Sequence, residues 1–150
     1  MTDTKLNDLL IRRLRPEDAD AISLIQEAIT KESGRIDYHR IVEEDARKED
    51  RLSFVAEVDG KVIGYMIAYV IQGGFGLKKS TWIGFFGVDP KHMGSSIGKR
   101  LAAEILRVSR EMGITNVFTS VRWDSTDLLS FFKSLGFGRS NFINLEKILD

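Results

Sequence analysis

A short turn rich in glycine and serine offers the clearest chemistry in the chain. Its residues are Met93, Gly94, Ser95, Ser96, Ile97, Gly98 and Lys99. The glycines and serines would let successive backbone N–H groups approach a ligand closely, and a helix beginning there would add the positive end of its dipole. Both properties favour negative charge. The turn therefore predicts an anion site, with a phosphate group as its ligand.

A plainer interpretation of this turn stays open. Ser95 or Ser96 could act only as a helix cap, which is all that most serine and glycine helix starts do. Gly98 indicates more than a cap, because a glycine within a helical turn lowers helix stability by roughly 1 kcal/mol relative to alanine. Two reasons would justify that cost, namely close approach of a ligand and tight packing of the helix on a strand.

The two common nucleotide motifs do not fit the turn. The segment from Gly94 to Lys99 has three residues between its glycines where a P-loop has four, and Arg100 stands where a P-loop has its magnesium-binding Ser or Thr. The dinucleotide pattern G-x-G-x-x-G also differs in spacing. These mismatches argue against a nucleoside triphosphatase and against a dinucleotide site.

The elements on either side of the turn must hold it in place. Residues 82–88 are apolar at odd and even positions alike, which is typical of a strand covered on both faces. Asp89-Pro90 ends this strand, because proline cannot donate a hydrogen bond to a neighbouring strand. After the turn, apolar residues at helical spacing predict a helix that ends at Gly113. A further strand over 116–123 would lie parallel to the first, joined to it by a right-handed crossover.

The first half of the chain predicts further parts of a sheet with helices. A strand is expected over 9–15, followed by a helix that Pro16 opens. The charged stretch 31–51 predicts a short second helix with a solvated face. Strands over 53–58 and 61–70 would form an antiparallel hairpin, because Asp59-Gly60 between them is a strong two-residue turn signal.

The C-terminal part predicts one more helix and one more strand. Residues 124–127 open the helix in the manner of an N-cap with an acid three residues on, and Gly136 ends it. The last apolar run, 140–149, is expected to form a closing strand.

Composition limits the function. With 150 residues, 43% of them hydrophobic, the chain predicts a single domain over 1–150. Basic and acidic residues number 22 each, and this balance argues against a nucleic-acid-binding module. The absence of cysteine excludes a thiolate nucleophile or a zinc–thiolate site, and the two histidines give no reason to expect another metal site. Without a signal-peptide pattern or an apolar run near 20 residues, a cytoplasmic protein that does not enter the membrane is expected.

Two motifs together resemble the GNAT superfamily of acyl-CoA-dependent N-acyltransferases. The turn and the strand before it resemble the family's acetyl-CoA motif, usually Q/R-x-x-G-x-G/A. A second segment is similar to the family's closing-helix motif, commonly L-Y-x-x-x-G-F; it reads Phe131-Phe132-Lys133-Ser134-Leu135-Gly136-Phe137. Three positions depart from the family pattern: Met93 replaces Arg or Gln, Ser96 replaces the first motif glycine, and Phe132 replaces tyrosine.

The resemblance implies an α/β (α+β) fold with a mixed, mostly antiparallel sheet of about six to seven strands, a central splayed parallel pair, and about four helices on both faces. It implies acetyl-CoA as co-substrate, no metal, and direct attack of an amine on the thioester. Phe86, Gly87 and Val88 would bind the pantetheine between the splayed strands, and an N–H near Val88 would polarise the thioester carbonyl. Amides from Gly94 to Lys99 would hold the pyrophosphate. Phe132 stands where the family's tyrosine commonly protonates the departing thiolate.

An ammonium acceptor must lose a proton before it attacks, but the sequence does not single out a base. Glu57, Tyr65 and Asp124 are candidates, each with an ordinary alternative role as strand-surface charge, core tyrosine or helix cap. Asp124 comes first, because it lies at a strand-to-helix junction near the expected splay. By the resemblance, Tyr38 and His39 are candidate contacts of the acceptor.

The resulting interpretation is an N-acetyltransferase acting on a primary amine, either of a small molecule or of a protein. Phe132 and the lack of a glutamate on the core strand keep a second interpretation open, a catalytically silent acyl-CoA-binding sensor or regulatory module. A third is an adapter domain without cofactor, in which Gly94 and Gly98 serve packing only. Exposed strand edges in so small a sheet are compatible with a homodimer.

Overall fold

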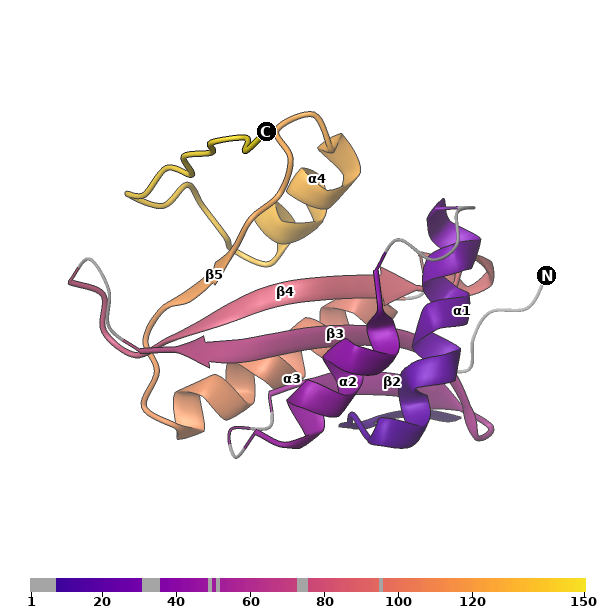
Figure 1. Cartoon of the computed structure of the whole chain (residues 1–150). Helices are drawn as coiled ribbons and strands as arrows, with labels where there is room; N and C mark the ends of the chain where they lie inside the picture. The colour runs from indigo at the N-terminus through magenta and orange to yellow at the C-terminus, as the bar shows by residue number, and fades with distance from the viewer. Residues whose placement is uncertain (1–7, 31–35, 49, 51, 73–75, 95) are drawn as a thin grey trace. The chain divides into compact units, whose positions relative to one another are not determined.

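The computed structural model describes residues 8–30, 36–48, 50, 52–72, 76–94 and 96–150. Internal contacts divide the chain into two compact units, Met1–Thr119 and Ser120–Asp150. The first unit contains a five-stranded sheet in the order β1-β2-β3-β4-β5 (Figure 1). The strands are β1 (Leu9–Arg13), β2 (Phe54–Val58), β3 (Lys61–Ile71), β4 (Ser80–Val88) and β5 (Val117–Thr119).

The sheet is mixed and mostly antiparallel, as predicted. Neighbouring strands from β1 to β4 are antiparallel, and β4 pairs with β5 in parallel. The parallel register joins Thr81 to Val117, Trp82 to Phe118 and Ile83 to Thr119, after which β4 continues to Val88. The two strands therefore share only a short ladder, which agrees with a splayed pair.

The strand count is lower than the predicted six to seven, because the closing strand expected over 140–149 is wrong. No strand forms there among the described residues, and the large apolar side chains are exposed, for example 88% for Leu145. Strand propensity reflects fit to a pleated, half-buried surface, and this run pairs with no strand among the described residues. The strand predicted over 116–123 is likewise confined to Val117–Thr119.

Helices cover both faces of the sheet in the first unit (Figure 1). The helical segments of the chain are η2 (Pro16–Asp18), α1 (Ala19–Thr30), α2 (Tyr38–Ala46), η3 (Pro90–His92), α3 (Ile97–Glu111) and α4 (Thr126–Ser134). One face carries α1 and α2, whose Ile22 and Val42 join a buried cluster with Tyr65 of β3. The opposite face carries α3, which contacts β3 at Gly64. None of the described helices is long and apolar enough to cross a bilayer.

The predicted hairpin between β2 and β3 is confirmed. Asp59 and Gly60 have φ values of 50° and 77°, so both turn residues are in the left-handed region. Such a two-residue turn matches the right-handed twist of the strands it joins.

A bulge in β4 was not predicted. Ile67 pairs with Phe85 and Ala68 with Ile83, so Gly84 is an extra residue in β4. A Cβ atom at Gly84 would lie 2.7 Å from Cε1 of Tyr69, so only glycine leaves room for that ring. Bulges bend a strand and redirect its backbone groups. The bulge follows directly on the last residue of β4 that pairs with β5.

The second unit contains α4 and the C-terminal segment. Ser125 is the N-cap residue of α4, and its side chain makes no capping hydrogen bond. Gly136, with φ of 91°, follows the end of this helix as predicted. The Phe132 ring makes edge contacts with Phe131 and Phe137, at centroid distances of 5.1 and 5.2 Å.

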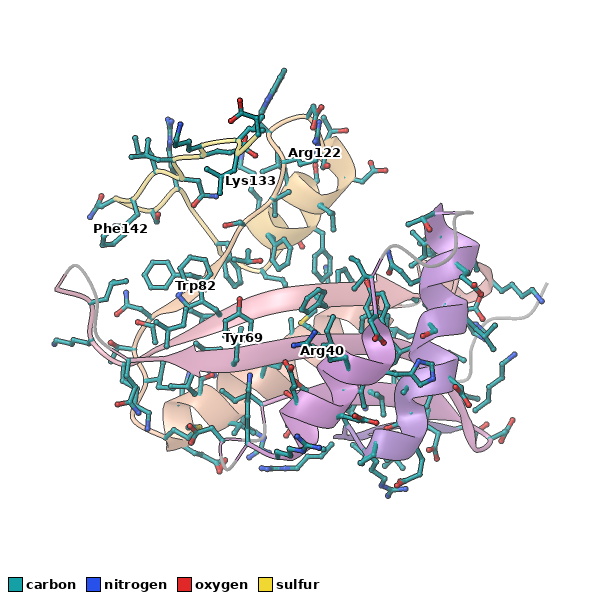
Figure 2. The ribbon with its side chains drawn as sticks, in the orientation of Figure 1. Arg40, Tyr69, Trp82, Arg122, Lys133 and Phe142 are labelled. Carbon is teal, nitrogen blue, oxygen red and sulfur yellow. The ribbon has the colours of Figure 1, made fainter. Side chains whose placement is uncertain are left out.

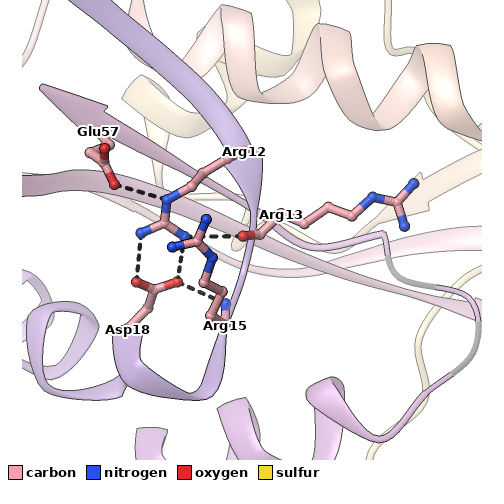
Figure 3. A network of polar contacts seen from close by, with 5 residues as sticks. All are labelled: Arg12, Arg13, Arg15, Asp18 and Glu57. Carbon is pink, nitrogen blue, oxygen red and sulfur yellow. Dashed lines mark hydrogen bonds and ion pairs between the residues drawn. The ribbon is translucent and has the colours of Figure 1, made fainter. Parts of the chain in front are cut away.

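An ion network ties the first strand to the first helical turn (Figure 3). The Arg12 guanidinium donates two hydrogen bonds to the Asp18 carboxylate, both 2.9 Å, and its Nε donates to Oε1 of Glu57 at 2.8 Å. Asp18 Oδ2 also accepts from the Arg15 backbone N–H at 2.8 Å. The side chains of Arg12 and Asp18 are only 13% and 6% exposed. Removing either partner would therefore leave a poorly solvated charge with a lost bidentate contact.

We expect Asp18→Ala to lower the free energy of unfolding by about 3 kcal/mol, because breaking a buried ion pair costs far more than breaking an exposed one. Urea denaturation followed by circular dichroism measures the change. The control is Glu44→Ala, which removes the exposed Arg40–Glu44 pair of α2 and should cost at most about 0.5 kcal/mol. Equal effects of the two substitutions would contradict the structural role of the network.

Candidate functional site

The predicted anion turn forms the start of α3. Gly94 has φ of 84°, and Ser96 adopts a left-handed conformation with φ of 67° and ψ of 14°. Left-handed backbone is costly for a residue with a Cβ atom, by roughly 1–2 kcal/mol, which gives a physical reason for the glycine usual in the resembled motif. Ser95, also predicted as a ligand residue, lies outside the described residues.

The first turn of α3 presents backbone donors without carbonyl partners in the helix. Among the described residues, the first backbone hydrogen bond of the helix runs from Arg100 N–H to Ser96 C=O, 3.1 Å. The N–H groups of Ile97, Gly98 and Lys99 precede this bond, and the first N–H groups of an α-helix have no acceptor within the helix. The Ser96 side chain makes no capping bond, so the structure does not support a simple cap at this residue. Three directed donors and the helix dipole together suit an anion.

Packing on the sheet fixes the position of this turn. A Cβ atom at Gly64 of β3 would lie 3.0 Å from Cγ2 of Ile97 and 3.5 Å from Cδ1 of Leu101. The absent side chain thus lets the first residue of α3 rest on the backbone of β3. Gly64 pairs with Val88, the last residue of β4, so the helix start lies at that end of β4. Gly98 is itself buried, which fits the packing explanation of this glycine as well as the ligand explanation.

The outer edge of β4 is the second feature of the site. Asp89 N–H donates to Ile63 C=O at 2.8 Å, so this N–H points toward β3. Backbone groups of successive strand residues point alternately to the two sides, so those of Gly87 point toward β3 and those of Val88 point away from it. β5 pairs with β4 only as far as Ile83. The N–H of Val88 is therefore directed to the side of β4 on which a ligand could pair with it.

The three candidate bases have different surroundings. Glu57 is held by Arg12 in the ion network. Tyr65 is completely buried and donates to Gln26 Oε1 at 2.6 Å, and burial raises its pKa further above the usual value. Tyr65 therefore stays protonated at neutral pH and cannot accept a proton. Asp124, in the second unit, is exposed, and its hydrogen bonds with Arg122 hold its pKa below the usual range, so it is ionised but weakly basic.

The two predicted acceptor contacts also differ. Tyr38 is a core residue, 6% exposed, with edge contacts to Tyr65 and Phe85 at 6.0 Å. His39 is on the surface, where its Nε2 lies 2.6 Å from Oδ1 of Asp20 on α1. Only His39 is therefore placed where a ligand could reach its side chain.

Sequence reasoning missed an aromatic group on β3, β4 and β5. Trp82 stacks on Phe118 at 5.3 Å, and Tyr69 is the cross-strand partner of Trp82 (Figure 2). The Lys48 ammonium lies 5.1 Å from the centre of the Tyr69 ring. The sequence signal for this group was Gly84, a single glycine within an otherwise apolar strand, because such a glycine often marks a bulge or a close approach of another group. The group that approaches Gly84 is the ring of Tyr69.

The predicted site residues are divided between the two units. The first unit contains those at one end of β4, namely Phe86, Gly87, Val88, the turn and the start of α3. The second unit contains Asp124 and Phe132.

Comparison with solved structures shows the same fold in several acetyltransferases. An aminoglycoside acetyltransferase from an uncultured soil metagenomic sample, in complex with trehalose, matches with a TM-score of 0.79 and 21% identity over 97% of this chain and 99% of the other. The aminoglycoside N-acetyltransferase AAC(6')-Iy in complex with CoA matches with a TM-score of 0.77 and 18% identity over 93% and 94%. A ribosomal-protein-alanine N-acetyltransferase from Brucella melitensis biovar Abortus 2308 matches with a TM-score of 0.73 and 16% identity over 93% and 99%.

A family model extends this likeness to the sequence. The model of the acetyltransferase (GNAT) family matches residues 18–137, a range that includes β4, the turn before α3 and the closing-helix motif. The chain belongs to the GNAT acetyltransferase family.

Proposed function

We propose that the protein transfers the acetyl group of acetyl-CoA directly to a primary amine. The observation that carries this proposal is the start of α3, where three backbone N–H groups lack helical acceptors at the end of β4. In the proposal these amides, with those of Gly94 and Ser96, bind the diphosphate of the coenzyme. Ser95 and Met93 complete the turn, and Lys99 adds positive charge at its rim.

The strand edge would then bind the pantetheine arm. The backbone groups of Phe86 and Val88 point away from β3 in this part of β4, whereas those of Gly87, also predicted to bind the arm, point toward β3. We assign to the N–H of Val88 the polarisation of the thioester carbonyl. A fixed donor at the carbonyl favours the transition state, because negative charge develops on the oxygen as the amine attacks.

Proton transfer is the weaker part of the chemistry in this chain. Asp124 is the proposed base, directly or through water, and its lowered pKa limits how readily it takes a proton. Phe132 has no hydroxyl to protonate the leaving thiolate, so water supplies that proton in the proposal. Because a thiolate is only moderately basic, this loss slows the reaction without preventing it.

The acceptor is a primary amine of a small molecule or of a protein. The structural neighbours are named for aminoglycosides and for a ribosomal-protein alanine, so this fold serves both kinds of acceptor. The phenylalanine at 132 favours a second candidate function, an acyl-CoA-binding module without turnover. Release of free CoA in the presence of a panel of amines distinguishes the two functions.

A charge introduced at the turn tests the diphosphate site. We expect Ser96→Asp to weaken CoA binding at least about tenfold, because a carboxylate would lie beside the proposed diphosphate. The same substitution should leave the melting temperature nearly unchanged, since aspartate tolerates left-handed backbone. Isothermal titration calorimetry measures the binding.

Ser96→Asn is the matched control. Asparagine has the same shape and backbone tolerance without the charge, so CoA affinity should stay within about twofold of the wild type. If the aspartate variant binds CoA as tightly as the asparagine variant, the diphosphate does not lie at this turn.

The position of Phe132 gives a second test. Phe132→Tyr should raise turnover with a competent amine or leave it unchanged, because a tyrosine hydroxyl there could protonate the thiolate. Steady-state release of CoA, followed with a thiol reagent, measures the effect. A large loss of turnover with unchanged acetyl-CoA affinity would contradict this placement of Phe132.

A further inference from the structure

The last residue of β5 makes a side-chain hydrogen bond where a backbone bond is usual. The Thr119 hydroxyl donates to the carbonyl of Ile83 on β4, with an O···O distance of 2.9 Å. Thr119 and Ile83 are also the final pair in the parallel register of the two strands. A regular parallel ladder would give this carbonyl a backbone N–H of the neighbouring strand. The hydroxyl of Thr119 thus closes the ladder at its last rung.

The closed rung lies directly before the bulge. Gly84, the extra residue of β4, follows Ile83, and β4 then continues to Val88 paired with β3 alone. The β5 side of β4 is therefore divided into two parts. Up to Ile83, β4 pairs with β5. Beyond the bulge, as far as Val88 with its outward-pointing N–H, β4 has no pairing with β5.

We infer that Thr119 is a positioning residue for the pantetheine arm of the coenzyme. Its hydroxyl fixes the point at which β5 separates from β4, and so keeps the edge of β4 near Val88 available for the ligand. This inference rests on the proposed function, because the arm is the ligand assigned to that edge. Thr119 contacts neither the coenzyme nor the reacting atoms in this scheme, and it acts through the backbone of β4.

A positioning role of Thr119 differs from a general stabilising role in a way that can be measured. A hydroxyl that only stabilises the sheet would affect every ligand of the first unit alike. A hydroxyl that positions the β4 edge affects ligands carrying the pantetheine arm and spares ligands that bind only at the start of α3. Acetyl-CoA is a ligand of the first kind, and 3′-phospho-ADP, which keeps the diphosphate but lacks the arm, is one of the second kind.

The experiment compares calorimetric dissociation constants of these two ligands for the wild type and variants of the full chain. We expect Thr119→Val to weaken acetyl-CoA binding about tenfold and to leave 3′-phospho-ADP binding within about twofold, because valine keeps the shape of threonine but leaves the Ile83 carbonyl without its donor. Thr119→Ser retains the hydroxyl and should bind both ligands like the wild type. Thr119→Ala provides the same comparison if the valine variant does not fold.

Ser109→Ala is the matched control on the other side of β4. Ser109 of α3 shares a buried hydrogen bond of 2.8 Å with Thr81, a residue of the same short ladder. Its loss should lower the melting temperature and leave both dissociation constants unchanged.

Three results would overturn the inference. In the first, Thr119→Val binds acetyl-CoA as tightly as the wild type. In the second, it loses affinity equally for both ligands, as a general structural effect would require. In the third, the wild type binds neither ligand; this result would overturn the proposed function as well, whereas the first two leave it standing.

Discussion

The contact between Ile97 and Gly64 is the constraint on which the candidate site depends. Because Gly64 has no side chain, Ile97 rests on the backbone of β3, where even a Cβ atom would lie only 3.0 Å from its Cγ2. The first turn of α3 is thereby held beside the end of β4, since Gly64 is the partner of Val88. A helix start that moved freely could not hold its N–H groups in a fixed arrangement toward one ligand. The packing of one glycine thus turns a common helix terminus into a preorganised one.

The two edges of β4 have different tasks. Toward β3 the strand is paired along its length, which makes it rigid, and the bulge at Gly84 adjusts its direction. Toward β5 the pairing ends at Ile83, where the Thr119 side chain replaces the next backbone donor. One strand can therefore be part of the core and still offer backbone groups to a ligand. This division explains why the proposed chemistry depends on backbone donors more than on side chains, several of which depart from the family pattern.

Local signals in the sequence predicted most of the helices and strands. The features that could not be predicted depend on pairing between strands that are distant in the sequence. The Asp59-Gly60 hairpin follows from the backbone preferences of two adjacent residues. The segment 140–149 has strand-like composition, but a strand also needs a partner, and composition alone does not provide one. The bulge at Gly84 depends on how two strands align, and β5 ends at Thr119, whose hydroxyl bonds to a carbonyl of another strand. At the site, the turn was located from its small residues, while the left-handed backbone of Ser96 became visible only in the structure.

The proposed function requires that backbone amides at the start of α3 bind the diphosphate of coenzyme A. The most direct measurement is a titration of the 15N-labelled protein with CoA and with 3′-phospho-ADP, followed by amide chemical shifts. We expect both ligands to produce their largest shifts in the amides from Gly94 to Lys99, and CoA alone to add a large shift at Val88. Unchanged amides in this turn, while other regions of the protein respond to CoA, would show that the diphosphate binds elsewhere.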